Sequence, residues 1–223
     1  MNQGRGSRSK PLRADAERNR QSIICAGARV LAEEGTAVTL EHIAEVAGVG
    51  TGTIYRRFAC LDELVAVVME DKITRYADRS EQAAARAATD PWGAFEDHVF
   101  FMLEQQATDV AFSELILSPR AGTAHFHDEI RRSFDASLVL IDRVKAAGMI
   151  RDDFHHSDLY LLLNANAGIV HGLGHRAPDS WRRFGHLMLQ AFRHPGDATL
   201  PQPPQSWVRP GHPRDESAGP PPT

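Results

Sequence analysis

The sequence predicts an all-α protein of about nine helices, with a small N-terminal three-helix domain followed by a larger helical domain. Three observations predict this class. Apolar residues recur at intervals of three and four along most of the chain, no stretch keeps the alternation of a strand, and helix-capping residues separate the apolar stripes. Of the 223 residues, 42% are hydrophobic and 24% are charged. That composition can build a core without disulfides or metals.

Composition divides the chain into four parts. We expect residues 1–12 to form a disordered basic arm, 13–60 a helix-turn-helix domain, and 61–194 the larger domain. Residues 195–223 hold nine of the 13 prolines. Such a segment cannot bury enough surface to offset its ordering entropy, so we predict a disordered Pro-rich tail.

The first predicted helix runs from about 13 to 34, where Ile24, Ala28 and Leu31 recur at helical spacing. Gly35 is its expected C-cap. Cys25 lies on this helix, and we expect its side chain to be buried as a small hydrophobe.

Two short helices follow, over 39–47 and 50–58. Thr39 is the expected N-cap of the first, and Gly48 is the turn between them.

The remaining helices are predicted from caps and stripes. One begins near Leu61, and Asp90-Pro91 is typical of the start of the next. Another holds Phe112 and stops near Pro119. An apolar stripe from Phe126 indicates a long helix that ends at Gly148. Ser157 is the expected N-cap of the next helix, which is apolar nearly all round. The last helix follows Pro178, and its predicted buried face is Trp181, Phe184, Met188 and Ala191.

The charge is uneven. The whole chain carries −4, yet residues 1–60 hold nine Lys and Arg against six Asp and Glu. A basic N-terminal region on an acidic body indicates a polyanion-binding head, although basic tails often serve only to solvate a chain.

The segment 39–58, TLEHIAEVAGVGTGTIYRRF, has the layout of a helix-turn-helix. Ile43 and Ala47 form the inner face of its first helix, and Ile54 and Phe58 anchor the second. In this motif the second helix enters the major groove of DNA.

Exposed residues of that second helix suit DNA. Hydroxyls, a phenol and guanidinium groups reach phosphates or base edges, and glycines allow a close backbone approach. The predicted contacts from this helix are Thr51, Gly52, Thr53, Tyr55, Arg56 and Arg57, with Gly50 beside them. The plain alternative is an ordinary helical hairpin, which also needs a glycine turn.

Residues 17–70, which include AERNRQSIICAGARVLAEEG and VTLEHIAEVAGVGTGTIYRRFACLDELV, resemble the N-terminal domain of TetR-type transcriptional repressors. The resemblance implies an all-helical homodimer with a C-terminal ligand-binding and dimerisation domain. It also implies that Thr39 contacts DNA. One departure is Leu61, where the family has a phosphate-gripping Lys, and Cys60 replaces the usual Ser or Thr cap. We expect one fewer phosphate contact per half-site, with Arg13, Arg18 and Arg20 as possible compensation.

The middle helices offer an aromatic- and Met-rich interior that suits a mostly apolar small molecule. The residues predicted to bind it are Trp92, His98, Phe101, Met102, Phe112, Phe134 and Asn164. The same residues would also serve an ordinary helical core. Asn164 and Asn166 interrupt an apolar helix, so both need polar partners.

Two histidine pairs, His171 with His175 and His125 with His127, lack a Cys or carboxylate at ligand spacing. We therefore predict no metal and no cofactor. Cys60 is a candidate redox switch.

The sequence thus predicts a one-component regulator, not an enzyme, and most simply a repressor that a small, mostly apolar ligand releases from its operator. Its expected partners are a pseudo-palindromic duplex and a second copy, joined through the helices near 157–174 and 178–194. No membrane is expected, and the expected compartment is the cytoplasm. Two alternatives stay open: a helical metal-binding enzyme that uses the histidine pairs, and a helical adaptor without DNA binding.

Overall fold

The structure is a computed structural model, and it describes residues 9–117, 126–174, 176–193 and 200–201. Within these ranges every regular element is a helix. The helices are α1 (Ser9–Glu34), α2 (Leu40–Ala47), α3 (Thr51–Tyr55), α4 (Leu61–Arg86), α5 (Pro91–Thr108), α6 (Val110–Leu117), α7 (His127–Ala146), α8 (His156–Leu173) and α9 (Ser180–Arg193). The predicted all-α class is confirmed. No helix in the described ranges combines the length and hydropathy needed to cross a bilayer.

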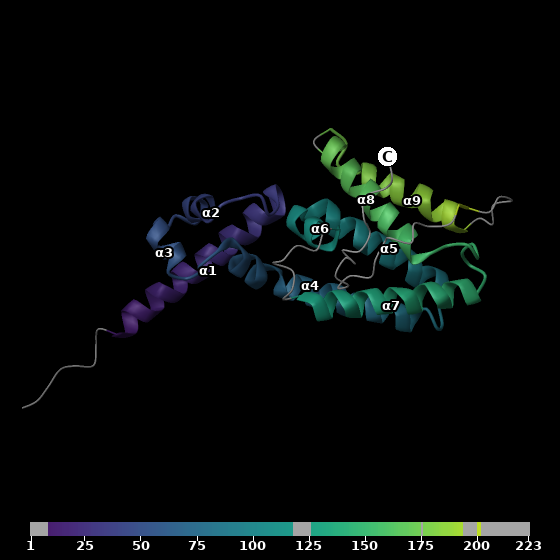
Figure 1. Ribbon diagram of the computed structural model, residues 1–223, viewed down its shortest axis with the longest axis horizontal. Coiled ribbons are helices and arrows are strands. Elements are labelled where there is room, and N and C mark those ends of the chain that lie inside the picture. Colours follow the sequence, from purple (N-terminus) through teal and green to yellow (C-terminus); the bar gives the residue numbers. More distant parts are fainter. Residues whose placement is uncertain (1–8, 118–125, 175, 194–199, 202–223) are drawn as a thin grey trace, which may run out of the picture.

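The head, α1 to α3, lies at one end of the molecule, and α4 runs from it into the body (Figure 1). Helix α1 packs against α2, α4 and α6. The fully buried side chains of Ile23, Ile43, Ile54 and Leu64 give the head its core. The two short helices are therefore held by packing, since helices of this length are not stable alone.

The body is built around α5, which contacts α4, α6, α7, α8 and α9. Helix α7 lies along α4 (Figure 1). Phe95, Phe112 and Phe154 are fully buried here. Phe95 and Phe154 meet edge to face, with ring centroids 5.8 Å apart.

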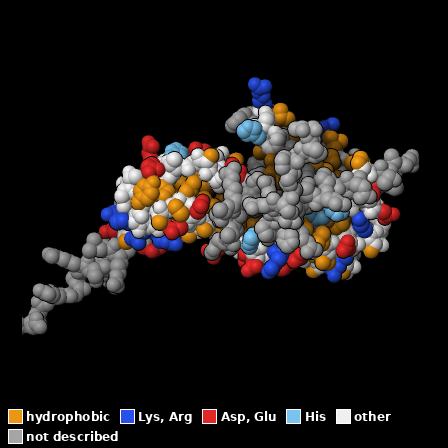
Figure 2. Space-filling view, in the orientation of Figure 1, with side chains coloured by type: hydrophobic (Ala, Val, Ile, Leu, Met, Phe, Trp, Pro, Cys, Tyr) orange, Lys and Arg blue, Asp and Glu red, His pale blue; other side chains and the backbone are white. Residues whose placement is uncertain are grey.

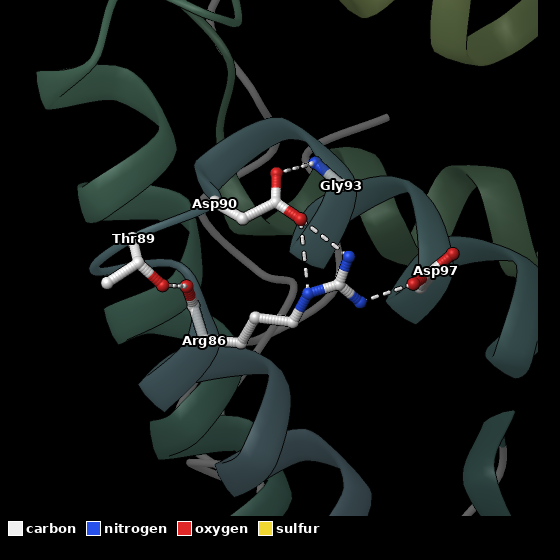
Figure 3. A network of polar contacts seen from close by, with 5 residues as sticks. All are labelled: Arg86, Thr89, Asp90, Gly93 and Asp97. Carbon is white, nitrogen blue, oxygen red and sulfur yellow. Dashed lines mark hydrogen bonds and ion pairs between the residues drawn. The ribbon is translucent and has the colours of Figure 1, made fainter.

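The junction between α4 and α5 is fixed by charge (Figure 3). Asp90 caps α5 by accepting a hydrogen bond from the Gly93 amide at 3.1 Å, with Pro91 in the first turn as predicted. The Arg86 guanidinium binds both Asp90 and Asp97, so it ties the end of one helix to the first turns of the next.

Several local predictions were wrong. Helix α1 begins at Ser9, so residues 9–12 of the predicted arm are helical, and α3 is shorter than the predicted 50–58. Helix α8 is capped by His155 in place of Ser157. Cys25 is exposed, because it lies on the face of α1 turned away from the head core.

The buried face of α9 also differs from the predicted one. The buried residues are Trp181, Gly185, Leu189 and Phe192, with Phe184 and Met188 only partly buried and Ala191 exposed. The face is rotated because Gly185 allows α9 to approach α5 closely, which a count of large apolar residues does not register. Residues 1–8 and all but 200–201 of the predicted tail lie outside the described residues.

Candidate nucleic-acid interface

The turn between α2 and α3 is built as the sequence predicts. Thr39 caps α2, and its hydroxyl accepts a hydrogen bond from the His42 amide at 3.2 Å. Gly48 ends α2 in the left-handed conformation, with φ 67°, which costs an L side chain energy but not glycine. The Val49 amide then donates to the Ala44 carbonyl at 3.0 Å, so the end of α2 is closed before α3 begins.

Helix α3 is anchored on one side only. Ile54 is fully buried and Phe58, just beyond the helix, is nearly so. The opposite side holds Thr51, Gly52 and Tyr55, all exposed, with Tyr55 47% exposed. The predicted DNA contacts of this helix therefore stand on its outer surface, apart from the half-buried Thr53.

Neither the backbone conformation nor the packing requires glycine at Gly50 or Gly52. Neither has positive φ, and a Cβ built at either position meets no atom within 4 Å. Alanine would be the better helix former at Gly52. The absence of side chains at Gly50 and Gly52 leaves the space in front of α3 open.

The polar side chains of the motif are already hydrogen-bonded to one another. The Tyr55 hydroxyl donates to the Glu41 carboxylate at 2.6 Å, and Arg56 donates to the Thr53 hydroxyl at 3.1 Å. The first bond lowers the pKa of Glu41 and raises the pKa of Tyr55. Both bonds lie at the exposed surface, so DNA can replace them.

The surface of the head carries both signs of charge on the face shown in Figure 2. Arg18 pairs with Asp15 on α1, so its charge is already partly neutralised. Arg56 and Arg57 are exposed, with no carboxylate partner among the described residues. These two arginines are therefore free to attract phosphate.

The start of α4 shows what replaces the phosphate-gripping Lys. Leu61 is half-buried and packs against the head core. Cys60 is the N-cap, but its side chain makes no capping bond. The Glu63 carboxylate instead accepts a hydrogen bond from the Ala59 amide at 2.7 Å. The helix start is thus satisfied internally and offers no cation.

The body contains a small cavity between α4, α5, α7 and α8, of about 30 Å³. Of the seven predicted ligand residues, Met102 and Phe134 line it. His98 is 2% exposed and reaches it indirectly, because its Nε2 lies 3.4 Å from the hydroxyl of Ser137, a lining residue. Phe112 is buried one layer behind, edge to face with Tyr76 of the lining.

The other three predicted ligand residues do not line it. Trp92 packs on Phe95 and under Arg193. Phe101 lies under Arg79 and, like Phe112, is one layer behind, stacked on Tyr76 of the lining with ring centroids 5.9 Å apart. Asn164 is exposed, and its amide donates to the Tyr160 carbonyl of its own helix at 2.7 Å.

Sequence reasoning missed the polar part of this cavity, which is Ser133, Ser137, His156 and Tyr160. The two serines are four residues apart on the buried face of α7, a signal that the spacing contained. Burial lowers the pKa of His156 to about 4 and raises the pKa of Tyr160 to about 12, so both groups are neutral near pH 7.

Two buried polar atoms have no partner within the described residues, Nδ1 of His98 and Oδ1 of Asn166. The Asn166 amide nitrogen donates to the Leu103 carbonyl and to Gln106. No group of three or more His, Cys, Asp or Glu is placed to hold a metal in the described part of the chain. His125 and His175 lie outside it.

Comparison with known proteins adds to this geometry. Residues 23–68 match the model of the family described as bacterial regulatory proteins, tetR family. No curated protein gives a significant match. A TetR transcriptional regulator from Streptomyces coelicolor is 26% identical over 78% of this chain and 98% of its own, with a TM-score of 0.50.

Two further solved structures are similar in fold. The fatty acid degradation regulator FadR from Bacillus halodurans is 19% identical over 78% of this chain and 100% of its own, with a TM-score of 0.53. The MbdR regulator from Azoarcus sp. CIB is 17% identical over 77% and 97%, with a TM-score of 0.57. The fold, the outward face of α3 and the matched motif agree: residues 23–68 match the tetR family of bacterial regulatory proteins, and the described fold is similar to that of solved TetR regulators.

Proposed function

We propose that this chain is a one-component transcriptional repressor, which binds duplex DNA through its head and leaves it when a small, mostly apolar molecule enters the body. The observation that carries the proposal is the outer face of α3. It presents the exposed hydroxyl of Thr51 and the phenol of Tyr55, with the Arg56 guanidinium at its end, beside two glycines that neither packing nor backbone conformation requires.

Each predicted contact has a role that its chemistry supports. Thr51 and Thr53 stand near the start of α3 and suit phosphate or base-edge hydrogen bonds. Arg56 suits bidentate recognition of guanine, while Arg57 and Tyr55 suit phosphates. Thr39, at the exposed start of α2, suits a phosphate on the far side of the groove.

The test is a fluorescence-anisotropy titration of the full chain against the duplex upstream of its own gene. Arg56→Ala should cost about 1–3 kcal/mol of binding free energy. Arg131→Ala is the matched control, since Arg131 is an exposed arginine on α7 that pairs only with Asp128. Equal losses in both variants, or no saturable binding by the unaltered chain, would contradict the proposal.

The second copy is proposed to bind through α8 and α9. Leu161, Ala165 and Gly168 are exposed at spacings of four and three along α8. Leu161 is 50%, Leu173 45% and Leu187 of α9 54% exposed. Apolar side chains gathered on two adjacent helices indicate a protein–protein surface. A symmetric dimer would present two heads to half-sites about one helical turn apart.

We expect Leu161→Glu with Leu187→Glu to give a monomer in light scattering, and to weaken binding to the two-half-site duplex. Val139→Glu is the control, because Val139 is also an exposed apolar residue, at 42%, and lies on α7. A doubly substituted chain that remains dimeric would exclude this interface.

The effector site is proposed at the cavity between α4, α5, α7 and α8. At about 30 Å³ it holds about one water molecule, so an effector must enlarge it. Met102 is the side chain best able to move, since it is unbranched. The neutral polar groups of the lining favour an uncharged ligand with one or two hydrogen-bonding groups.

A further inference from the structure

A second concave site lies outside the proposed effector cavity between α4, α5, α7 and α8. It is a groove of about 480 Å³ where α4 and α5 meet the C-terminal part of α1, which contributes Ala32. This volume is in the range typical of small-molecule sites. The groove joins the head to the body, because its walls come from both.

The two carboxylates in the groove are already neutralised. Asp109 pairs with Lys72 and accepts a hydrogen bond from the Phe112 amide at 2.9 Å. Asp78 pairs with Arg132 of α7, at 2.8 Å. Both acids thus have a charged partner, and among the described residues neither is paired with the remaining cations of the groove.

Those cations are Arg75 and Arg79, one helical turn apart on α4. Within the described residues neither has a carboxylate partner. The Arg75 Nε donates only to the Asp71 carbonyl of its own helix, at 3.2 Å. The Arg79 guanidinium lies over the ring of Phe101, 5.1 Å from its centroid. Two like charges thus share one concave, partly aromatic surface.

A smaller hollow of about 120 Å³ lies beside the groove and shares Arg79, Gln82 and Phe101 with it. His98 lines this hollow. Its Nε2 faces Ser137 on the other side, and its Nδ1 is the buried nitrogen without a partner.

We infer that this groove binds a small organic carboxylate, with the carboxylate between Arg75 and Arg79 and its apolar part against Phe101. A guanidinium offers paired N–H donors that match the two oxygens of a carboxylate. The phenyl ring supplies an apolar surface beside that charge. This site is separate from the proposed effector cavity, and it does not depend on whether the head binds DNA.

The probe is 2-naphthoate, compared with 2-naphthamide, which has nearly the same shape and no charge. Calorimetric titration of the full chain should give a Kd for naphthoate below about 1 mM. The amide should bind at least about tenfold more weakly. Because the attraction is between partly exposed charges, added salt should weaken the binding of naphthoate.

The decisive variant is Arg75→Gln with Arg79→Gln, which should weaken naphthoate binding by about tenfold or more. Both arginines are exposed, so the fold and the DNA binding of the variant serve as checks on its integrity. Arg131→Gln is the control for loss of charge and should bind the probe normally.

Three results would overturn the inference: no saturable binding of naphthoate, equal affinity for the amide, or an unchanged affinity in the double variant. Loss of binding on Ser137→Leu alone would also overturn it, since that substitution fills the apolar cavity and would place the probe there.

Discussion

The hydrogen bond between Tyr55 and Glu41 pairs an acid with a residue that we propose to contact DNA. The carboxylate accepts the tyrosine hydroxyl at 2.6 Å and stands on the exposed surface of α2. Since its pKa is lowered by this bond, Glu41 stays ionised throughout the neutral range. A phosphate that takes the Tyr55 hydroxyl must therefore approach a negative charge.

We predict that Glu41→Gln strengthens DNA binding several-fold at low salt, because it removes this repulsion and releases the Tyr55 hydroxyl. Anisotropy titrations at two salt concentrations measure the effect. Glu45→Gln makes the same charge change on α2 without a tyrosine contact, and its gain should be smaller. If the two variants gain equally, the effect is one of net charge and the Tyr55 contact is irrelevant.

Gly52 gives a second test at this scale. Alanine there meets no atom within 4 Å and suits a helix better, so Gly52→Ala should leave the free energy of unfolding unchanged or raise it by up to about 1 kcal/mol. DNA binding should nevertheless fall, because the added methyl occupies the space that the groove needs. Chemical denaturation and anisotropy measure the two quantities. A variant that binds DNA normally would show that this space is not used.

The outward side of α3 could be predicted because the motif is local: the turn at Gly48 and the anchors Ile54 and Phe58 fix which side chains are exposed. The ligand residues depend on packing between helices distant in sequence, which spacing within one helix does not determine. Thus Phe134 lines the cavity, but Trp92 packs on Phe95 away from it and Phe101 lies behind Tyr76 of the lining.

Among the elements, α9 shows how a small residue sets a helix face. A Cβ at Gly185 would lie 2.8 Å from Leu103 Cδ1 and 2.9 Å from Phe100 Cε1 on α5. The approach of the two helices therefore requires the absence of a side chain. A prediction of the buried face from large apolar residues alone includes Phe184 and Met188, which flank this contact.

We predict that Gly185→Ala lowers the free energy of unfolding by about 1–3 kcal/mol, because it overpacks this contact. Urea denaturation followed by circular dichroism measures the change. Gly52→Ala is the matched control, since it adds the same methyl to a helix in open space. A stability loss no larger than that of the control would mean that α9 shifts without cost.

At the scale of the whole molecule, α6 ties the body to the head. The Glu114 carboxylate accepts hydrogen bonds from the Thr36 amide at 2.8 Å and the Thr36 hydroxyl at 2.5 Å. The Lys72–Asp109 pair lies at the start of the same helix. These contacts hold α6 directly to the loop between α1 and α2, which precedes the two short helices of the motif.

Removing this tie should loosen the loop without unfolding the body. We predict that Glu114→Ala speeds hydrogen exchange at the Thr36 amide by about ten- to a hundredfold, the range for a lost hydrogen bond to a charged group. Exchange in α5 should be unchanged. Glu104→Ala, which removes an exposed carboxylate of α5, is the control. Equal exchange at Thr36 in both variants would show that the tie does not hold the loop.

Buried histidines give the stability of the whole chain a pH dependence. Burial, Arg79 and His156 lower the pKa of His98 to about 4, and burial lowers that of His156 to about 4 as well. Both side chains are neutral in the folded protein at pH values where the unfolded chain begins to bind protons. Stability is therefore complete above pH about 6.5 and is lost as the pH falls toward 4.

We predict that unfolding free energies measured from pH 7.5 to pH 4.5 fall steadily below pH 6.5. The contribution of His98 alone to this loss of unfolding free energy is about 3 kcal/mol. His98→Phe keeps a buried ring and removes one titrating site, so the slope should be smaller by about 1.4 kcal/mol per pH unit. Ser137 keeps its own bond to the Ser133 carbonyl at 2.8 Å, so the substitution leaves no new unpaired hydroxyl.

The control is His127→Phe, which changes an exposed histidine and should retain the full slope. Parallel curves for His98→Phe and the unaltered chain would mean that water reaches the His98 ring and that this side chain is not desolvated in solution.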